Sequence, residues 1–109
     1  MGTVQQIPVW EARNLATTNP NNLLVCGYEK DDDFHKYDLE GAISLGDFRR
    51  RMKSLAKDQL IIFYCACPHD ETAIAQAEKY TKEGFTNVRI MQGGFNAWKD
   101  AGYPVAAMV

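Results

Sequence analysis

The five residues at 60–64, Leu-Ile-Ile-Phe-Tyr, limit the possible fold of this chain more than any other segment. The run is uninterrupted and rich in β-branched and aromatic side chains, which favour strands. A strand that is apolar at every position has both faces buried, as the central strands of parallel sheets do. Because parallel strands need long crossover connections, usually helices, this run predicts an α/β fold.

The rest of the chain alternates in the way that such a fold requires. Apolar runs predict further strands at residues 23–26, 42–44 and 88–91. Helix patterns lie at residues 8–16, 47–55, 71–83 and 95–101, and the acidic segment at 30–33 can open a brief helix. Strands that alternate with helices predict a parallel sheet that is covered on both faces.

The composition indicates one ordinary globular domain. The 109 residues are too few for two independent cores, so we expect a single domain over residues 1–109. Hydrophobic residues make up 46% of the chain and charged residues 24%, as in soluble proteins. The formal net charge of −2 gives no general attraction to nucleic acid. The basic run at residues 49–51 is interpreted as a solvated helix face.

No segment of the sequence has the pattern of a membrane span or a secretory signal. A bilayer-crossing helix needs about 20 apolar residues, and no stretch approaches that length. Residues 1–6 lack the charged start and the long apolar region of a signal peptide. We therefore expect a cytoplasmic protein that binds neither membranes nor nucleic acid.

The cysteines suggest chemistry at one loop. There are three, Cys26, Cys65 and Cys67, and an odd, low count argues against a disulfide framework. Cys65 directly follows the run at 60–64, at the strand end where ligands bind in parallel α/β sheets. The loop leads into a helix, whose unpaired N–H groups and dipole stabilise an anion, and successive loop amides can surround it.

A cysteine in that position has a lowered pKa and becomes a nucleophile. The alternative is that Cys65 is only the last residue of a buried strand. Cys67 argues against this, because a second thiol in the same loop is hard to explain as packing. Cys26, on an earlier strand, is interpreted as a buried and inert thiol.

Several segments of the chain resemble the rhodanese family. Residues 64–88 are similar to the family's active-site strand, loop and helix. Residues 93–98 (Gly-Gly-Phe-Asn-Ala-Trp) and 102–105 (Gly-Tyr-Pro-Val) resemble its closing motif. Residues 23–26 and 40–43 stand where the family has a strand followed by Asp-Val-Arg and a Pro-Gly-Ala-Ile turn. The resemblance covers nearly the whole chain, and the closing motif is its more specific part.

The resemblance implies a fold and an activity. The fold is a three-layer α/β sandwich, with a central, mostly parallel five-stranded sheet and helices on both faces. The activity is sulfur transfer: a cysteine takes a sulfane sulfur from thiosulfate or a persulfide, becomes a persulfide, and passes the sulfur to cyanide or a thiol, including a protein thiol. No cofactor or metal is expected. Phe95 and Trp98 are expected to close the core, and Tyr64 to pack within it.

The resemblance leaves two choices for the catalytic cysteine. Cys65 directly follows Tyr64, as the family's cysteine follows its strand. Gly84, however, lies 19 residues after Cys65 and 17 after Cys67, and the second value is closer to the family's usual spacing. Either the loop is longer than usual or Cys67 is the nucleophile. We favour Cys65, because its place at the strand end is the firmer anchor.

The other candidate substrate-binding residues belong to the same loop and helix start: Ala66, Pro68, His69, Asp70, Glu71 and Thr72. This segment is acidic where the family often has Gly and Arg. Asp70 and Glu71 are interpreted as helix caps, which would use the dipole that an anionic substrate needs. That argues against tight binding of thiosulfate or phosphate. His69 can act as a proton donor, but we favour an exposed loop residue, and we expect His35 to be solvated.

Three other functions remain open. The first is a rhodanese-like module without catalysis, used for protein binding or for redox sensing through Cys65 and Cys67. The second is a metal site, since Cys65, Cys67 and His69 are soft ligands, but zinc wants a fourth ligand and a different spacing. The third is a phosphatase or arsenate reductase, which would need an Arg to grip the oxyanion. Thr72 or a neighbouring acid stands at that position.

Overall fold

The computed structural model describes residues 4–19, 21–67 and 69–106. Its sheet has the order β1-β5-β4-β2-β3, and every pair of neighbouring strands is parallel. The strands are β1 (Gln5–Ile7), β2 (Leu23–Cys26), β3 (Ala42–Ile43), β4 (Ile61–Tyr64) and β5 (Val88–Met91). The predicted α/β fold with a five-stranded sheet is confirmed, and β4 is its central strand.

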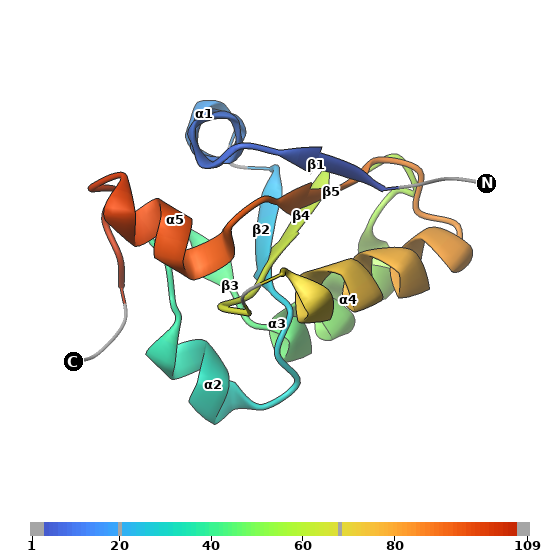
Figure 1. Cartoon of the computed structure of the whole chain (residues 1–109). Helices are drawn as coiled ribbons and strands as arrows, with labels where there is room; N and C mark the ends of the chain where they lie inside the picture. Colours follow the sequence, from blue (N-terminus) through green and yellow to red (C-terminus); the bar gives the residue numbers. More distant parts are fainter. Residues whose placement is uncertain (1–3, 20, 68, 107–109) are drawn as a thin grey trace.

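Helices cover both faces of the sheet (Figure 1). One face carries α3 (Leu45–Arg51) and α4 (Glu71–Lys82), and the other carries α1 (Val9–Thr18) and α5 (Gly94–Asp100). The short helices α2 (Asp31–Lys36) and η1 (Met52–Ser54, a 3-10 turn) complete the set. The three layers predicted from the alternation of elements are therefore present.

Strand β4 serves two separate cores, because successive side chains of a strand point to opposite faces. Ile61 and Phe63 lie in the core beneath α3 and α4, which we call the α3/α4 core. Ile62 and Tyr64 lie in the core beneath α1 and α5, the α1/α5 core. All four side chains are fully buried, so the apolar run at 60–64 has the central place that its composition predicts.

An aromatic cluster dominates the α3/α4 core. The Phe48 ring lies edge-on to Phe63 and to Tyr80, with ring centroids 5.7 and 5.0 Å apart. Phe85 packs at 6.1 Å from the same ring. Edge-to-face pairs of this kind stabilise a core beyond the effect of area burial. This cluster fixes α4, and with it the loop that enters α4, against the sheet.

The C-terminal segment closes the α1/α5 core. Trp98 is fully buried, and its indole N–H donates to the Pro104 carbonyl at 2.8 Å. Val105 forms an isolated antiparallel bridge with Leu39. Phe95 is buried in the same core. The predicted packing role of Phe95 and Trp98 is confirmed, as is that of Tyr64.

Two expectations about the elements are corrected. Strand β1 was not predicted, because Gln5 and Gln6 are exposed on an edge strand and carry no apolar signal. The helix predicted over 47–55 begins at Leu45 instead, because the Ser44 hydroxyl accepts the Asp47 N–H at 3.1 Å and so caps the helix earlier. Its last turn is the 3-10 segment η1.

The interpretation of residues 49–51 as a solvated face is wrong for Arg49. Its Nε donates to the Tyr80 hydroxyl at 2.9 Å, and its Nη2 donates to Glu29 at 2.8 Å. Arg50 and Arg51 are exposed, as expected. None of the helices described here is long and apolar enough to cross a membrane.

Replacing Phe48 with alanine should destabilise the fold by about 3–5 kcal/mol, because a fully buried ring leaves a cavity among three aromatic neighbours. Urea denaturation followed by circular dichroism measures the free energy of unfolding. The control is Arg51→Ala on the exposed side of the same helix, which should stay within about 0.5 kcal/mol of the native protein. Equal effects of the two variants would contradict the described core.

Candidate active site

The cysteine loop, residues 65–70, connects the carboxyl end of β4 to the start of α4. Its first residue is pinned by the backbone, since the Phe95 N–H donates to the Cys65 carbonyl at 2.9 Å. The close approach depends on Gly94, where a Cβ would overlap that carbonyl oxygen. Gly94 also has a φ of +58°, which side chains disfavour. The Gly-Gly pair that opens the chain's most specific motif therefore holds the loop.

Cys65 places its thiol in the interior. The residue is 0% exposed and belongs to the α3/α4 core. Burial raises the pKa of the Cys65 thiol to about 12, and hydrogen bonding to Cys67 adds to the rise, although the backbone N–H groups of Cys67 and Ala73 act in the opposite direction. Cys65 thus follows the strand as predicted, but its thiol stays protonated at neutral pH.

Cys67 places its thiol at the surface of the same core, half-buried. Its sulfur donates to the Thr72 hydroxyl at 3.2 Å and lies 3.4 Å from the Tyr28 hydroxyl. Burial acts to raise the pKa of Cys67, but hydrogen bonds from the Thr72 and Tyr28 hydroxyls, the Cys65 thiol and the Thr72 backbone outweigh it. The pKa of Cys67 is therefore lowered, and this thiol is the more readily ionised of the two.

Tyr28 connects the loop to the neighbouring strand. Its hydroxyl accepts the Ala66 N–H at 3.1 Å, so its own proton is free to be donated to the Cys67 sulfur. Burial, followed by the bond to Cys67, raises the pKa of Tyr28 well above its usual value, and the phenol remains a donor. The expected action of backbone amides on the sulfur is present through the Thr72 backbone, which lowers the pKa of Cys67. The Ala66 amide reaches the sulfur only through the Tyr28 hydroxyl.

Tyr28 was not predicted from the sequence, although a signal for it existed. β2 and β4 pair in parallel, with Cys26 opposite Tyr64. The residues that follow the two strands therefore lie side by side at the carboxyl end of the sheet. Once residues 23–26 and 60–64 are taken as neighbours, Tyr28, two residues after β2, is placed beside the cysteine loop.

Asp70 stands at the N-cap position of α4 as predicted, but its side chain does not cap the helix. Its φ of 59° is left-handed, and its side chain makes no capping bond to α4. Oδ2 instead accepts the Gly93 N–H at 3.0 Å, and Oδ1 is buried without a hydrogen-bond partner among the described residues. The left-handed backbone turns this carboxylate away from its own helix and towards α5. Asp70 is 6% exposed and ties the end of the loop to the Gly-Gly turn.

The remaining predicted residues take different places. Thr72 contacts the Cys67 sulfur, and Ala66 contributes only its backbone to the site. His69 and Glu71 are exposed, so the favoured interpretation of His69 as a surface residue is confirmed. Pro68 lies outside the described residues.

The predicted burial or exposure is also found for the cysteine and the histidine that lie outside the loop. Cys26 is fully buried in the α1/α5 core, where burial raises its pKa to about 11. His35 is exposed on α2. Within residues 4–19, 21–67 and 69–106, no group of three or more His, Cys, Asp or Glu side chains is placed to hold a metal ion.

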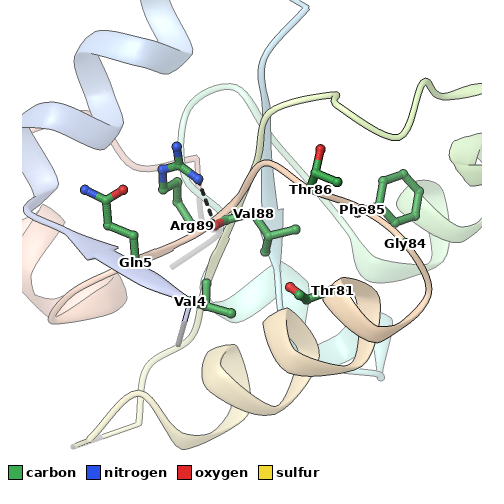
Figure 2. A pocket seen from close by; sticks show the side chains of 8 residues that line it. All are labelled: Val4, Gln5, Thr81, Gly84, Phe85, Thr86, Val88 and Arg89. Carbon is green, nitrogen blue, oxygen red and sulfur yellow. Dashed lines mark hydrogen bonds between the residues drawn. The ribbon is translucent and has the colours of Figure 1, made fainter. Parts of the chain in front are cut away.

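A hollow of about 490 Å³ lies elsewhere, at the amino end of β5 (Figure 2). Val88 and Arg89 line it together with Val4 and Thr81, and the Arg89 guanidinium donates to the Val88 carbonyl at 3.1 Å. The strands are parallel, so this hollow is at the opposite end of the sheet from the cysteine loop. No cysteine lines it among the residues that the structure describes, and we place no chemistry there.

A family model described as the rhodanese-like domain matches residues 12–101. The chain belongs to the rhodanese-like domain family. No curated protein matches it at a significant level. The match takes in both cysteines of the loop, Tyr28, Asp70 and the Gly-Gly turn.

Solved rhodanese-like structures share the fold. A rhodanese-like domain from Anabaena sp. is 22% identical, with a TM-score of 0.78 over 97% of this chain and 81% of that one. The polysulfide-sulfur transferase from Wolinella succinogenes is 18% identical, with a TM-score of 0.72 over 96% and 80%. The thiosulfate sulfurtransferase from Pseudomonas aeruginosa is 16% identical, with a TM-score of 0.79 over 95% of this chain and 20% of that one.

Gly94→Ala should destabilise this rhodanese-like domain more than Gly102→Ala does. Both glycines have positive φ, which costs an alanine about 1–2 kcal/mol. Only at Gly94 does the new methyl group meet the Cys65 carbonyl, which adds roughly 1–3 kcal/mol. A Cβ at Gly102 meets nothing within 4 Å. Urea denaturation measures both, and equal losses would show that the contact with the loop is not as described.

Iodoacetamide should alkylate Cys67 along a pH profile whose midpoint lies below the ~8.5 of an unperturbed thiol, because the lowered pKa populates the thiolate earlier. Tyr28→Phe should raise that midpoint by roughly one pH unit, since it removes a hydrogen bond to a charged sulfur. Peptide mass spectrometry identifies the modified cysteine at each pH.

The matched control for this titration is Tyr37→Phe. The Tyr37 ring packs 5.5 Å from the Tyr28 ring, and no bond from its hydroxyl to the described part of the loop is present, so the midpoint should not move. First alkylation at Cys65, or an unchanged midpoint in Tyr28→Phe, would show that the donors do not act on Cys67.

Proposed function

We propose that this rhodanese-like domain is a sulfurtransferase whose nucleophile is Cys67. The Cys67 thiolate attacks the sulfane sulfur of a donor, forming a bond between Sγ and that sulfur while the bond from the sulfane sulfur to the rest of the donor breaks. The products are a Cys67 persulfide and the reduced remainder of the donor. An acceptor thiolate or cyanide then attacks the outer sulfur, which restores the Cys67 thiolate.

One observation carries the choice of Cys67 over Cys65. Cys67 is the loop thiol that is partly exposed to solvent. It is also hydrogen-bonded to two hydroxyl groups, those of Thr72 at 3.2 Å and Tyr28 at 3.4 Å. When the thiol ionises, both hydroxyls can turn their protons towards the sulfur. Cys65 has the opposite environment, fully buried in an apolar core that disfavours a thiolate.

The charge of the loop bears on the class of donor. Glu71 lies in the first turn of α4, and no Lys or Arg among the described residues forms a hydrogen bond with the Cys67 sulfur. A thiosulfate dianion would meet a negative charge without a guanidinium to neutralise it. A persulfide or polysulfide donor has less charge to bury, so we propose it over thiosulfate. The same lack of a guanidinium argues against an oxyanion-binding phosphatase or arsenate reductase.

The exposure and the free state of the thiols bear on the sulfur acceptor and on the cellular location. A small thiol, cyanide or an exposed protein thiol can each remove the outer sulfur, because Cys67 is half-exposed beyond the carboxyl end of β4. All three cysteines are free. A cytoplasmic location fits a chain that keeps three reduced thiols.

A second candidate function is a non-catalytic module for protein binding or redox sensing. The acidic start of α4 favours it, because Glu71 in the first turn uses the helix dipole from which a donor anion would otherwise gain. Two thiols that stand two residues apart and shift each other's pKa would serve a redox sensor equally well.

The test of the proposed function compares the native protein with Cys67→Ser and Cys65→Ser in a sulfurtransferase assay. Glutathione persulfide and thiosulfate serve as separate donors, with cyanide as the acceptor and thiocyanate as the measured product. We expect Cys67→Ser to fall to the uncatalysed rate and Cys65→Ser to keep transfer to cyanide. The persulfide donor should outperform thiosulfate in the native protein.

Cys26→Ser is the control, since that thiol is buried in the other core. Loss of transfer in Cys65→Ser alone would make Cys65 the nucleophile. Absence of thiocyanate above background in every protein would favour the binding module.

A further inference from the structure

We propose that Cys65 and Cys67 act together as a dithiol that reduces the bound sulfur to free sulfide. This inference rests on the proposed function, because it starts from a persulfide on Cys67. It adds an outcome that sulfur transfer does not include: in the absence of an acceptor, the domain releases hydrogen sulfide and forms a Cys65–Cys67 disulfide.

The first support is the direction of the side chains. Cys65 is a member of the α3/α4 core, and Cys67 packs against that core. Ala66, between them, packs against the α1/α5 core. Although Ala66 forms a bend, the side chains of residues 64–67 thus alternate between the two cores, which puts both thiols on the side of the α3/α4 core. Each thiol also shifts the pKa of the other, as neighbouring ionisable groups do.

The second support is the backbone on either side of the pair. The Cys65 carbonyl accepts the Phe95 N–H at 2.9 Å, and the Ala66 N–H donates to the Tyr28 hydroxyl at 3.1 Å. The peptide group between Cys65 and Ala66 is therefore held by hydrogen bonds on both of its sides. This restricts the backbone between the two thiols and reduces the entropy lost when they approach.

The third support is that the two thiols differ in their exposure to solvent and in their hydrogen bonds, as a dithiol reaction requires. Cys67 is half-exposed and bonded to hydroxyl groups, so an external donor can reach it. Cys65 is 0% exposed, and sulfur transfer makes no use of it. A buried thiol is protected from external donors and oxidants, but it can still be reached by the sulfur two residues away.

The reaction balances with these two residues and the transferred sulfur. Cys65 Sγ attacks Cys67 Sγ of the persulfide, forming the Cys65–Cys67 bond while the bond from Cys67 Sγ to the outer sulfur breaks. The outer sulfur takes the electron pair and leaves as HS⁻, with the proton that Cys65 gives up. The outer sulfur is reduced by two electrons, and each cysteine sulfur is oxidised by one. A small dithiol reductant then returns the disulfide to two thiols.

The distances in the chain permit this bond. Two residues of extended chain span at most about 6.8 Å between Cα atoms, and disulfides join Cα atoms that are usually 4.4–6.8 Å apart. The pair can close if the Cys65 side chain turns out of the core by a small amount. A disulfide across two residues is strained, and strained disulfides are reduced easily, which suits a bond that must open in each cycle.

The experiment loads the full chain with glutathione persulfide and follows sulfide with a sulfide-selective electrode, without added acceptor. Intact-mass spectrometry of the same samples reports on the cysteines. The native protein should release one sulfide per chain and lose two hydrogens. Cys65→Ala should hold one added sulfur and release no sulfide above the background of Cys67→Ala. Cys26→Ala is the matched control and should behave as the native protein.

The outcomes separate this inference from the proposed function. If the native protein holds a stable added sulfur, as Cys65→Ala does, sulfur transfer stands and the dithiol reaction is overturned. If Cys65→Ala takes up no sulfur, the proposed function fails and the inference fails with it. Cys65→Ser replaces the alanine variant if circular dichroism shows that the latter does not fold.

Discussion

The hydrogen bond from the Phe95 N–H to the Cys65 carbonyl is the contact on which the candidate site depends. It joins the end of the central strand to the start of α5, two segments that are far apart in the sequence. It forms only because Gly94 lets the two backbones approach. Asp70 reinforces the same junction through the Gly93 N–H. The loop between these two anchors is short, so the position of Cys67 follows from the packing of the sheet and α5.

The same junction shows how the core and the chemistry are connected. The α3/α4 core contains both the aromatic cluster around Phe48 and the Cys65 thiol. Cys67 packs on the surface of that core, where hydroxyl groups replace apolar neighbours. The surroundings of the thiol therefore change from apolar side chains at Cys65 to hydroxyl groups at Cys67. This change accounts for the opposite directions of the two pKa values.

Much of the fold could be predicted because its signals are local. Strands β2 and β5 have the predicted bounds, since each is a short apolar run between polar residues. Strand β1 was missed because an edge strand with two exposed glutamines has no apolar pattern. In the site, the loop and its two thiols could be predicted from position alone. Tyr28 could be found only by first pairing β2 with β4. The role of Asp70 could not be predicted, because it depends on a left-handed φ that the sequence does not reveal.

The alternation that continues from β4 through Ala66 makes the spacing between strand and loop a part of the site. Although Ala66 forms a bend, successive side chains of residues 64–67 contact opposite cores, so inserting a single residue after Tyr64 should turn both sulfurs towards α1 and α5. There they would lose Thr72 and Tyr28 together. An insertion of two residues would keep the facing of the thiols while lengthening the loop. The reactivity of the two thiols thus depends on whether the segment after β4 changes in length by an odd or an even number of residues. An odd change separates the thiols from the Thr72 and Tyr28 hydroxyls, and an even change leaves them on the correct side.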